Sequence, residues 1–335
     1  MIGGFKLKKV AVIFTGGTIS MKIDPRINAA IPALSSEEIM AMVTNIEKYA
    51  DIETINFSKL PGPHMTPELM LDLSNKIKET LKRDDIDGVI VTHGTDTLEE
   101  TAYFLEWNIK TQKPIVLVGA MRNGSELGYD GPSNLSAAIC TAISDESKGK
   151  GVIVVMNNEV NAATEVTKTN TLALDTFKSP EFGPLGIVDN DEVIYYRNKK
   201  THDHIENIDR IETKVGLVKC GAGMSSDIIN YYIDSGYRGL VIEALGRGNV
   251  PPNMLEGIER AINANIPVII VSRCPTGRVL DTYGYEGAGK TLRNLGAIFG
   301  FNLPGHKARI KLMLAISYTD DMEIIKNIFE KDRLK

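Results

Sequence analysis

The sequence predicts an α/β fold in two parts, a larger N-terminal parallel-sheet domain and a smaller C-terminal α/β domain. Short apolar runs of buried-strand length alternate with helical patterns, which is typical of a parallel sheet covered by helices on both faces. A chain of 335 residues is long enough for two ordinary domains. A polar stretch without an apolar stripe separates two such alternations. We therefore expect domains at residues 1–197 and 214–335, joined by a linker at 198–213.

The N-terminal strands are predicted from four continuous apolar runs, residues 10–14, 89–92, 115–118 and 152–156. The clearest helix begins after Thr66, because threonine is a good N-cap and proline fits the first helical position. That helix then carries an apolar face made of Leu69, Leu73, Ile77 and Leu81.

The end of the first domain and the second domain follow from the same signals. Two short apolar stretches within residues 186–197 flank an Asp-Asn-Asp turn, which predicts a β-hairpin. The second alternation predicts strands at 215–219, 240–243 and 268–272, with helices near 226–234 and 253–264.

Composition excludes several classes of function. A net charge of −5 without a long basic run argues against a nucleic-acid partner and favours a small neutral or zwitterionic substrate. No apolar run approaches the roughly 18 residues that cross a membrane. The run at 10–14 is too short for a signal-peptide core, so we expect cytoplasmic residence. We interpret the widely spaced Cys140, Cys220 and Cys274 as small buried hydrophobes.

Three loop segments follow predicted strands: residues 15–18, 93–96 and 119–121. Ligands of open parallel sheets bind outside the carboxyl ends of the strands. These segments therefore predict a site.

The first segment belongs to the motif F-T-G-G-T-I-S, in which two glycines allow a tight turn and leave Thr15 at a strand end. Thr15 is a candidate nucleophile, although a Gly-Gly turn by itself is more often only a turn. In V-T-H-G-T-D-T, Thr95 and Asp96 precede a predicted helix, whose free N–H groups can stabilise an oxyanion, and Asp96 can bind an ammonium. The alternative is that either residue merely caps the helix.

A third motif, V-T-K-T-N-T, contains Lys168. This lysine could accept a proton if burial disfavours its charged form. Taken alone, a solvated surface lysine is the more common case.

Together these motifs resemble those of the bacterial-type L-asparaginases and the related glutaminase-asparaginases. T-G-G-T-I, H-G-T-D-T-x-E-E-T-A, V-G-A-M-R, D-G-P-x-N-L and V-T-K-T-N-T occur in the order found in that family. The segments S-R-C-P-T-G and H-K-A-R extend the resemblance to residue 309, so that it covers nearly the whole chain.

The resemblance implies amide hydrolysis through an acyl-threonine intermediate. Thr15 matches the nucleophile, while Thr95, Asp96 and Lys168 match the second catalytic group. Ala120 matches the position whose backbone carbonyl meets the substrate amide.

The resemblance also implies a homo-oligomer, dimer or tetramer, with sites at subunit contacts. Asn249 resembles an asparagine that reaches a neighbouring subunit's site, and Glu286 is the candidate for a glutamate with the same role. No cofactor and no metal are implied.

Two departures from the family pattern concern the substrate pocket. The family's lid tyrosine has no counterpart between Met21 and Lys48, although residues 21–36 are otherwise lid-like. The serine that binds the substrate carboxylate aligns within residues 61–65, which contain no serine, so that backbone groups or His64 would replace it.

Other signals point elsewhere. Residues 284–291 match the P-loop pattern but do not directly follow a strand, and His202 with His204 lacks further metal ligands nearby. The alternatives are a broad glutaminase-asparaginase, an amidotransferase subunit acting on charged tRNA, and a catalytically silent amino-acid sensor. The second is disfavoured because the chain starts at the first motif, and the third because both threonines and Lys168 are present.

Overall fold

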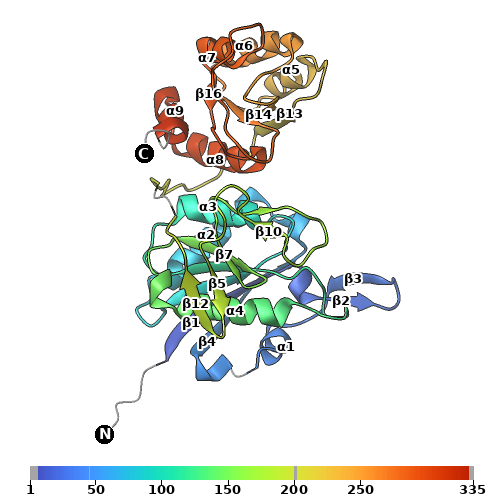
Figure 1. The fold of residues 1–335 in the computed structure, drawn as a ribbon, viewed down its shortest axis with the longest axis vertical. Coiled ribbons are helices and arrows are strands. Elements are labelled where there is room, and N and C mark those ends of the chain that lie inside the picture. Colours follow the sequence, from blue (N-terminus) through green and yellow to red (C-terminus); the bar gives the residue numbers. More distant parts are fainter. Residues whose placement is uncertain (1–6, 45, 200–201, 332–335) are drawn as a thin grey trace. The chain divides into compact units, whose positions relative to one another are not determined.

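The computed structural model describes residues 7–44, 46–199 and 202–331. The chain divides into two compact units, residues 1–201 and 202–335, and each has its own sheet (Figure 1). The predicted α/β class, with a larger N-terminal and a smaller C-terminal part, is confirmed. The division lies within the predicted linker, whose limits stay a prediction and whose residues 200 and 201 lie outside the described residues.

The first unit is built on an eight-stranded sheet in the order β12-β11-β8-β7-β6-β5-β1-β4. The five strands from β7 to β4 run parallel, and the other three continue the sheet antiparallel. The strands are β1 (Lys8–Gly16), β4 (Ala50–Leu60), β5 (Gly88–Thr92), β6 (Ile115–Val118), β7 (Val152–Met156), β8 (Glu159–Ala162), β11 (Gly186–Asp189) and β12 (Glu192–Tyr195).

Helices cover both faces of this sheet, α2 and α3 on one and α1 and α4 on the other (Figure 1). The Thr66 hydroxyl accepts a hydrogen bond from the Leu69 N–H at 3.3 Å, which confirms the predicted start of α2. The helices are α1 (Ser36–Ala41), α2 (Pro67–Leu81), α3 (Leu98–Asn108) and α4 (Gly131–Ile143). Single 3-10 turns occur at Thr18–Ser20, Ile46–Lys48, Gly62–His64 and Asp145–Ser147.

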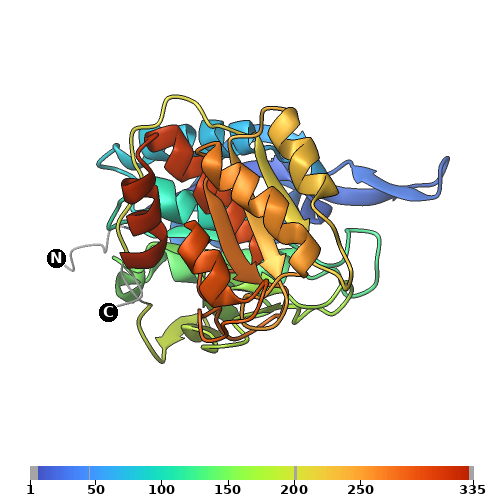
Figure 2. The ribbon, with the colours of Figure 1, turned by 90° about the horizontal axis from the view of Figure 1, so that it is seen from above.

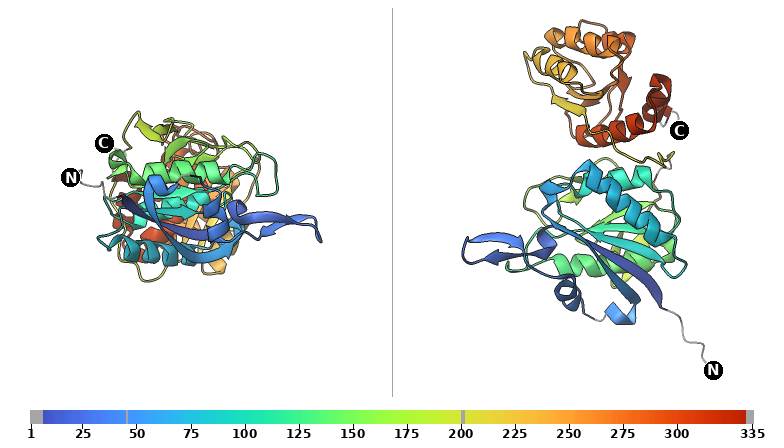
Figure 3. Two further views of the ribbon diagram at one scale, coloured as in Figure 1. Left: turned by 90° about the horizontal axis from the view of Figure 1, so that it is seen from below. Right: turned by 180° about the vertical axis from the view of Figure 1, so that it is seen from behind.

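Two short hairpins complete the first unit. The lid-like segment forms the hairpin β2 (Met21–Asp24) and β3 (Ala29–Pro32), which projects from the body of this unit (Figures 2 and 3, blue). The V-T-K-T-N-T motif lies on the hairpin β9 (Thr167–Lys168) and β10 (Phe177–Lys178).

The second unit is a four-stranded parallel sheet in the order β13-β14-β15-β16. Helices α5, α6 and α7 cover one face, and α8 and α9 the other (Figure 1). The elements are β13 (Val215–Lys219), α5 (Asp227–Asp234), β14 (Gly239–Ala244), a 3-10 turn (Pro252–Met254), α6 (Leu255–Asn263), β15 (Val268–Ser272), α7 (Gly289–Leu295), β16 (Ile298–Phe299), α8 (Gly305–Tyr318) and α9 (Met322–Glu330). No described helix is long and apolar enough to cross a membrane.

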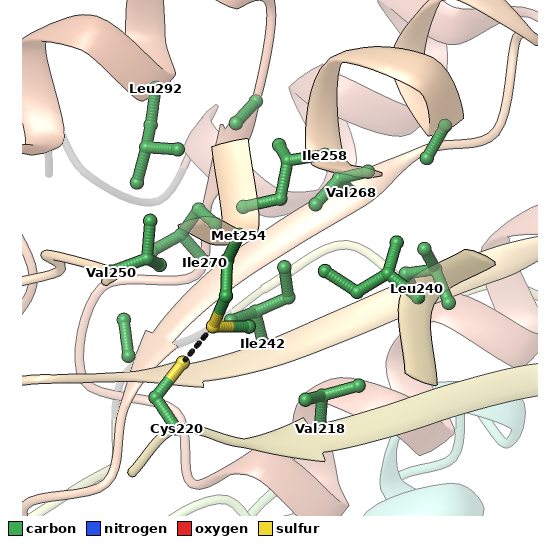
Figure 4. Close-up of a cluster of buried hydrophobic side chains, with 14 of the residues drawn as sticks. Val218, Cys220, Leu240, Ile242, Val250, Met254, Ile258, Val268, Ile270 and Leu292 are labelled. Carbon is green, nitrogen blue, oxygen red and sulfur yellow. Dashed lines mark hydrogen bonds between the residues drawn. The ribbon is translucent and has the colours of Figure 1, made fainter. Parts of the chain in front are cut away.

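The core of the second unit also shows how the cysteines are used. The Cys220 thiol lies among Val218, Ile242 and other apolar side chains, 3.7 Å from the Met254 sulfur (Figure 4). Burial raises the pKa of this thiol to about 11. Cys140 is likewise buried, but Cys274 is exposed in the loop after β15, so the expectation of burial is wrong for Cys274.

The strand β4, the longest among the described residues, was not predicted from the sequence. In this strand charged and apolar residues alternate, and the strand lies at the edge of the sheet, where most of its side chains are only partly buried. The continuous apolar run that identifies a central strand is therefore absent.

Candidate active site

At the carboxyl ends of neighbouring strands, glycine backbone atoms of different loops are in direct contact. A Cβ added to Gly17 would lie 2.5 Å from the Gly94 Cα, and one added to Gly94 would lie 2.4 Å from the Gly62 Cα. A Cβ on Gly119 would lie 2.7 Å from the His93 carbonyl oxygen. Only glycine permits such contact, so these residues bring the loops after β1, β4, β5 and β6 together.

Thr15 lies in this region, as the penultimate residue of β1. It is 1% exposed, and its Oγ1 donates a hydrogen bond to the Thr92 carbonyl oxygen on β5 at 2.7 Å. The hydroxyl is thus held by backbone, and the two following residues, Gly16 and Gly17, have φ values of 112° and 84°. Glycine is required for that turn, which leaves Thr15 beside the loop ends.

Strand β4 bulges opposite Thr15. Residues 14 and 16 of β1 pair with residues 56 and 60 of β4, and Ser58 lies within the bulge. Its hydroxyl donates to the Thr15 carbonyl oxygen at 2.7 Å. Ser58 was not predicted from the sequence, because its strand has no continuous apolar run.

The second predicted group comes together as one hydrogen-bonded cluster. Lys168 Nζ donates to Thr95 Oγ1 at 3.0 Å and lies 2.8 Å from Asp96 Oδ1. Thr95 is buried, whereas the Asp96 side chain is 60% exposed. The cluster thus combines a buried hydroxyl with a carboxylate that remains open to a ligand.

Neither Thr95 nor Asp96 caps helix α3. The N-cap is Thr97, and its hydroxyl donates to the Gly62 carbonyl oxygen at 2.8 Å instead of accepting from the helix. In the first turn of α3, Glu99 Oε1 accepts the backbone N–H of Lys168 at 3.1 Å. Glu99 therefore fixes the backbone at Lys168. In the sequence, the only signal for this role is that Glu99 lies in the first turn of the helix after Thr95 and Asp96.

His93 holds the loop from within. Its Nδ1 lies 2.9 Å from the Gly94 carbonyl oxygen and its Nε2 lies 2.9 Å from Thr101 Oγ1. Burial lowers the pKa of His93 to about 4, so the ring is neutral at pH 7. Because a carbonyl only accepts, we assign the proton to Nδ1, and Nε2 then accepts from Thr101. Both ring nitrogens of His93 are therefore used to hold the loop after β5.

The remaining candidates lie in two places. Ala120 is fully buried just after β6, and His64 is exposed at the end of its 3-10 turn. Asn249 and Glu286 belong to the second unit, where both line a pocket of about 660 Å³. The first unit therefore contains both Thr15 and the lysine cluster but neither Asn249 nor Glu286.

The P-loop match has the wrong structural context. Residues 273–288 separate the end of β15 from the start of α7, whereas a P-loop joins a strand to a helix directly. Tyr285 and Glu286 of this segment line the pocket of the second unit.

Comparison with known proteins covers both units. The family model "Asparaginase, N-terminal" matches residues 9–201, and "Glutaminase/Asparaginase C-terminal domain" matches residues 214–329. The chain is 36% identical over 331 residues to a probable periplasmic L-asparaginase of Haemophilus influenzae, covering 97% of this chain and 93% of that protein. It is also 36% identical to an L-asparaginase of Bacillus licheniformis, covering 94% of this chain and 98% of that protein.

Two further similarities complete the comparison. One component of the glutamyl-tRNA(Gln) amidotransferase of Methanosarcina barkeri is 36% identical, covering 98% of this chain and 78% of that protein. The crystal structure of a probable cytoplasmic L-asparaginase from Campylobacter jejuni superposes with a TM-score of 0.86 at 32% identity, covering 96% of this chain and 99% of that one.

Proposed function

Because the chain belongs to the asparaginase family, we propose that it is an L-asparagine amidohydrolase that releases L-aspartate and ammonia. The observation that carries the proposal is the cluster in which Lys168 joins Thr95 to Asp96, beside the strand that positions Thr15. Two similar proteins, from Haemophilus and Bacillus, bear the name L-asparaginase.

In the proposed first step, Thr15 Oγ1 attacks the side-chain carbonyl carbon of the substrate. The carbon–nitrogen bond breaks, the threonine proton ends on ammonia, and an ester with Thr15 remains. Before substrate binds, the Thr15 hydroxyl donates to the Thr92 carbonyl oxygen, so the hydroxyl must turn toward a proton acceptor when substrate binds. Backbone N–H groups near Thr95, before α3, would stabilise the oxyanion.

In the second step, a water molecule held by Thr95 attacks the ester carbon. As the bond to Thr15 breaks, Lys168 gives one ammonium proton to the Thr15 oxygen and takes the water proton in its place. Thr95 Oγ1 accepts from Lys168 Nζ at 3.0 Å, so its own proton is directed elsewhere and can orient the water.

Substrate recognition follows from the surrounding groups. The exposed Asp96 carboxylate would bind the substrate ammonium, sharing its charge with Lys168. The Ala120 carbonyl would accept from the substrate amide, and His64 or nearby backbone would meet the α-carboxylate. Asn249 and Glu286 would reach the site of a neighbouring subunit in a homo-oligomer, dimer or tetramer. No metal or organic cofactor has a role in this scheme.

The test is ammonia release from asparagine and from glutamine over a concentration range, without nucleotide or metal. We expect Thr15→Ala to abolish turnover while the circular dichroism spectrum is unchanged; activity within tenfold of wild type would remove Thr15 as the nucleophile. Thr95→Ala is the matched control, because it should still form the acyl-enzyme, visible as an added mass on the intact protein. Equal rates on both amides would favour the broad glutaminase-asparaginase.

A second candidate is an amidotransferase subunit, favoured by the similarity to the Methanosarcina barkeri protein. Ammonia release only in the presence of a partner protein and charged tRNA would support it over the free hydrolase. We also propose cytoplasmic residence. The Campylobacter jejuni structure is described as a cytoplasmic asparaginase, whereas the Haemophilus influenzae protein is described as periplasmic.

A further inference from the structure

The carboxylate of Asp130 binds the backbone of the turn that follows β6. Asp130 accepts the backbone N–H of Met121 at 3.1 Å from Oδ1 and 3.0 Å from Oδ2, and that of Arg122 at 2.9 Å from Oδ1. Ala120, which directly precedes these two donors, is fully buried. The backbone after Ala120 is therefore fixed by a charged group at the other end of the same loop, at the start of α4.

Asp130 does this instead of capping its own helix. It is the N-cap residue of α4, a position where aspartate normally accepts from the first free N–H groups of the helix. Its side chain makes no such bond. The carboxylate points toward the loop. It therefore stabilises the turn after β6 and does not accept the free N–H groups of α4.

Asn134, one turn along α4, locks this arrangement. Its Nδ2 donates to Asp130 Oδ2 at 2.9 Å and to the Gly119 carbonyl oxygen at 3.1 Å. Its Oδ1 accepts the Asn157 N–H at 3.0 Å. Both ends of the amide are thus engaged, and the carboxylate cannot turn without breaking its hydrogen bond with Asn134. These two residues are the first and last polar positions of D-G-P-x-N-L, a motif given no role so far.

The geometry of the peptide bond links this contact to the site. In a trans peptide the N–H and the C=O point in opposite directions. Because the Met121 N–H points at Asp130, the Ala120 carbonyl oxygen points away from it. A charged acceptor on the N–H also draws electron density toward the carbonyl oxygen of the same peptide, which strengthens that oxygen as an acceptor.

We propose that Asp130 is a positioning residue that orients and polarises the Ala120 carbonyl toward the side-chain amide of the substrate. The inference rests on the proposed function, because the amide nitrogen must be the leaving group. One N–H of that nitrogen is held by the Ala120 carbonyl, which leaves the nitrogen free on its other side to receive the proton from Thr15. Asp130 thereby acts on the departure of ammonia and not on the attack by the threonine.

The test compares two leaving groups on the same acyl group. Asparagine loses ammonia, whereas the β-methyl ester of aspartate loses methanol, which has no N–H for the Ala120 carbonyl. For both substrates kcat/KM reports the acylation half of the reaction. We expect Asp130→Asn to lower kcat/KM at least about tenfold on asparagine and much less on the ester. The variant removes the charge that strengthens the Ala120 carbonyl as an acceptor, and only the amide substrate donates to that carbonyl.

The matched control is Glu126→Gln in the same loop. Glu126 Oε2 accepts the Asn123 N–H at 2.7 Å, so this variant also replaces a carboxylate that binds loop backbone. Its ratio of amide to ester activity should stay that of wild type. The ratio does not depend on how much of a variant is folded, and Asn134→Ala, with a smaller shift in the same direction, supplies the test if Asp130→Asn is insoluble.

Equal losses on amide and ester in Asp130→Asn, or in Asn134→Ala where that variant replaces it, would overturn the proposal and leave a purely structural role. A wild-type protein that releases no ammonia from asparagine but hydrolyses the ester would instead count against the proposed function. The two failures are therefore distinguishable.

Discussion

Acid should destabilise the first unit through one buried ring, His93. The folded protein holds this histidine neutral, since burial lowers its pKa to about 4 from an ordinary value of 6.5. The unfolded chain binds a proton at the ordinary value. Between these two values the unfolded state therefore binds more protons, so stability falls as the pH falls.

The size of the effect follows from the same two values. The contribution of His93 is complete above pH 6.5. By linkage about 2 kcal/mol of it is lost by pH 5 and about 3 kcal/mol by pH 4. Glu53, whose pKa the Arg83 guanidinium holds at about 2, loses its own contribution mainly below pH 4.5, so the two windows are separable.

The assay is denaturant unfolding at pH 7, 6, 5 and 4, followed by the fluorescence of Trp107, the single tryptophan, which lies in α3 of the same unit. His93→Gln keeps a donor and an acceptor but cannot titrate. We expect this variant to be less stable at pH 7 and to lose less stability than wild type on going to pH 4. Parallel pH profiles of the two proteins would refute the reasoning, as would an imidazole NMR signal of His93 that titrates near pH 6.5.

Further predictions concern the chemistry. Asp96→Ala should cost about 1.5–3 kcal/mol more with asparagine than with succinamate, which lacks the α-amino group; equal losses would contradict an ammonium-binding role. Lys168→Met should lower kcat by about 10²–10⁴-fold. Because the lid tyrosine has no counterpart, Tyr283 and Tyr285 in the loop before α7 are the rival proton acceptors; if Lys168→Met stays within tenfold while a Tyr283→Phe/Tyr285→Phe double variant loses its activity, the tyrosines carry the proton instead. Ammonia release should survive EDTA and the removal of nucleotide, and a loss with either treatment would reveal a cofactor that the scheme lacks.

Local patterns predicted the central strands of both sheets, the β11–β12 hairpin and the helices α2, α5 and α6, but not α1, α4, α7, α8 or α9. The apolar runs of β1, β5, β6 and β7 were predicted because central strands of a parallel sheet are buried on both faces. The cap and proline that start α2 act within one turn of helix. The edge strand β4 and the two-residue strand β16 have no such local pattern, and neither was predicted.

The candidate site divides in the same way. By itself the sequence determined which residue types stand at the strand ends, because the glycines that allow backbone contact and the motifs beside them are consecutive in the chain. Only the tertiary structure decided their partners: Ser58 binds Thr15 from 43 residues away, and Lys168 binds Thr95 from 73 residues away. Such pairs depend on strand register, on a bulge and on loop packing, and these are set by burial of the whole sheet and not by the neighbours of either residue.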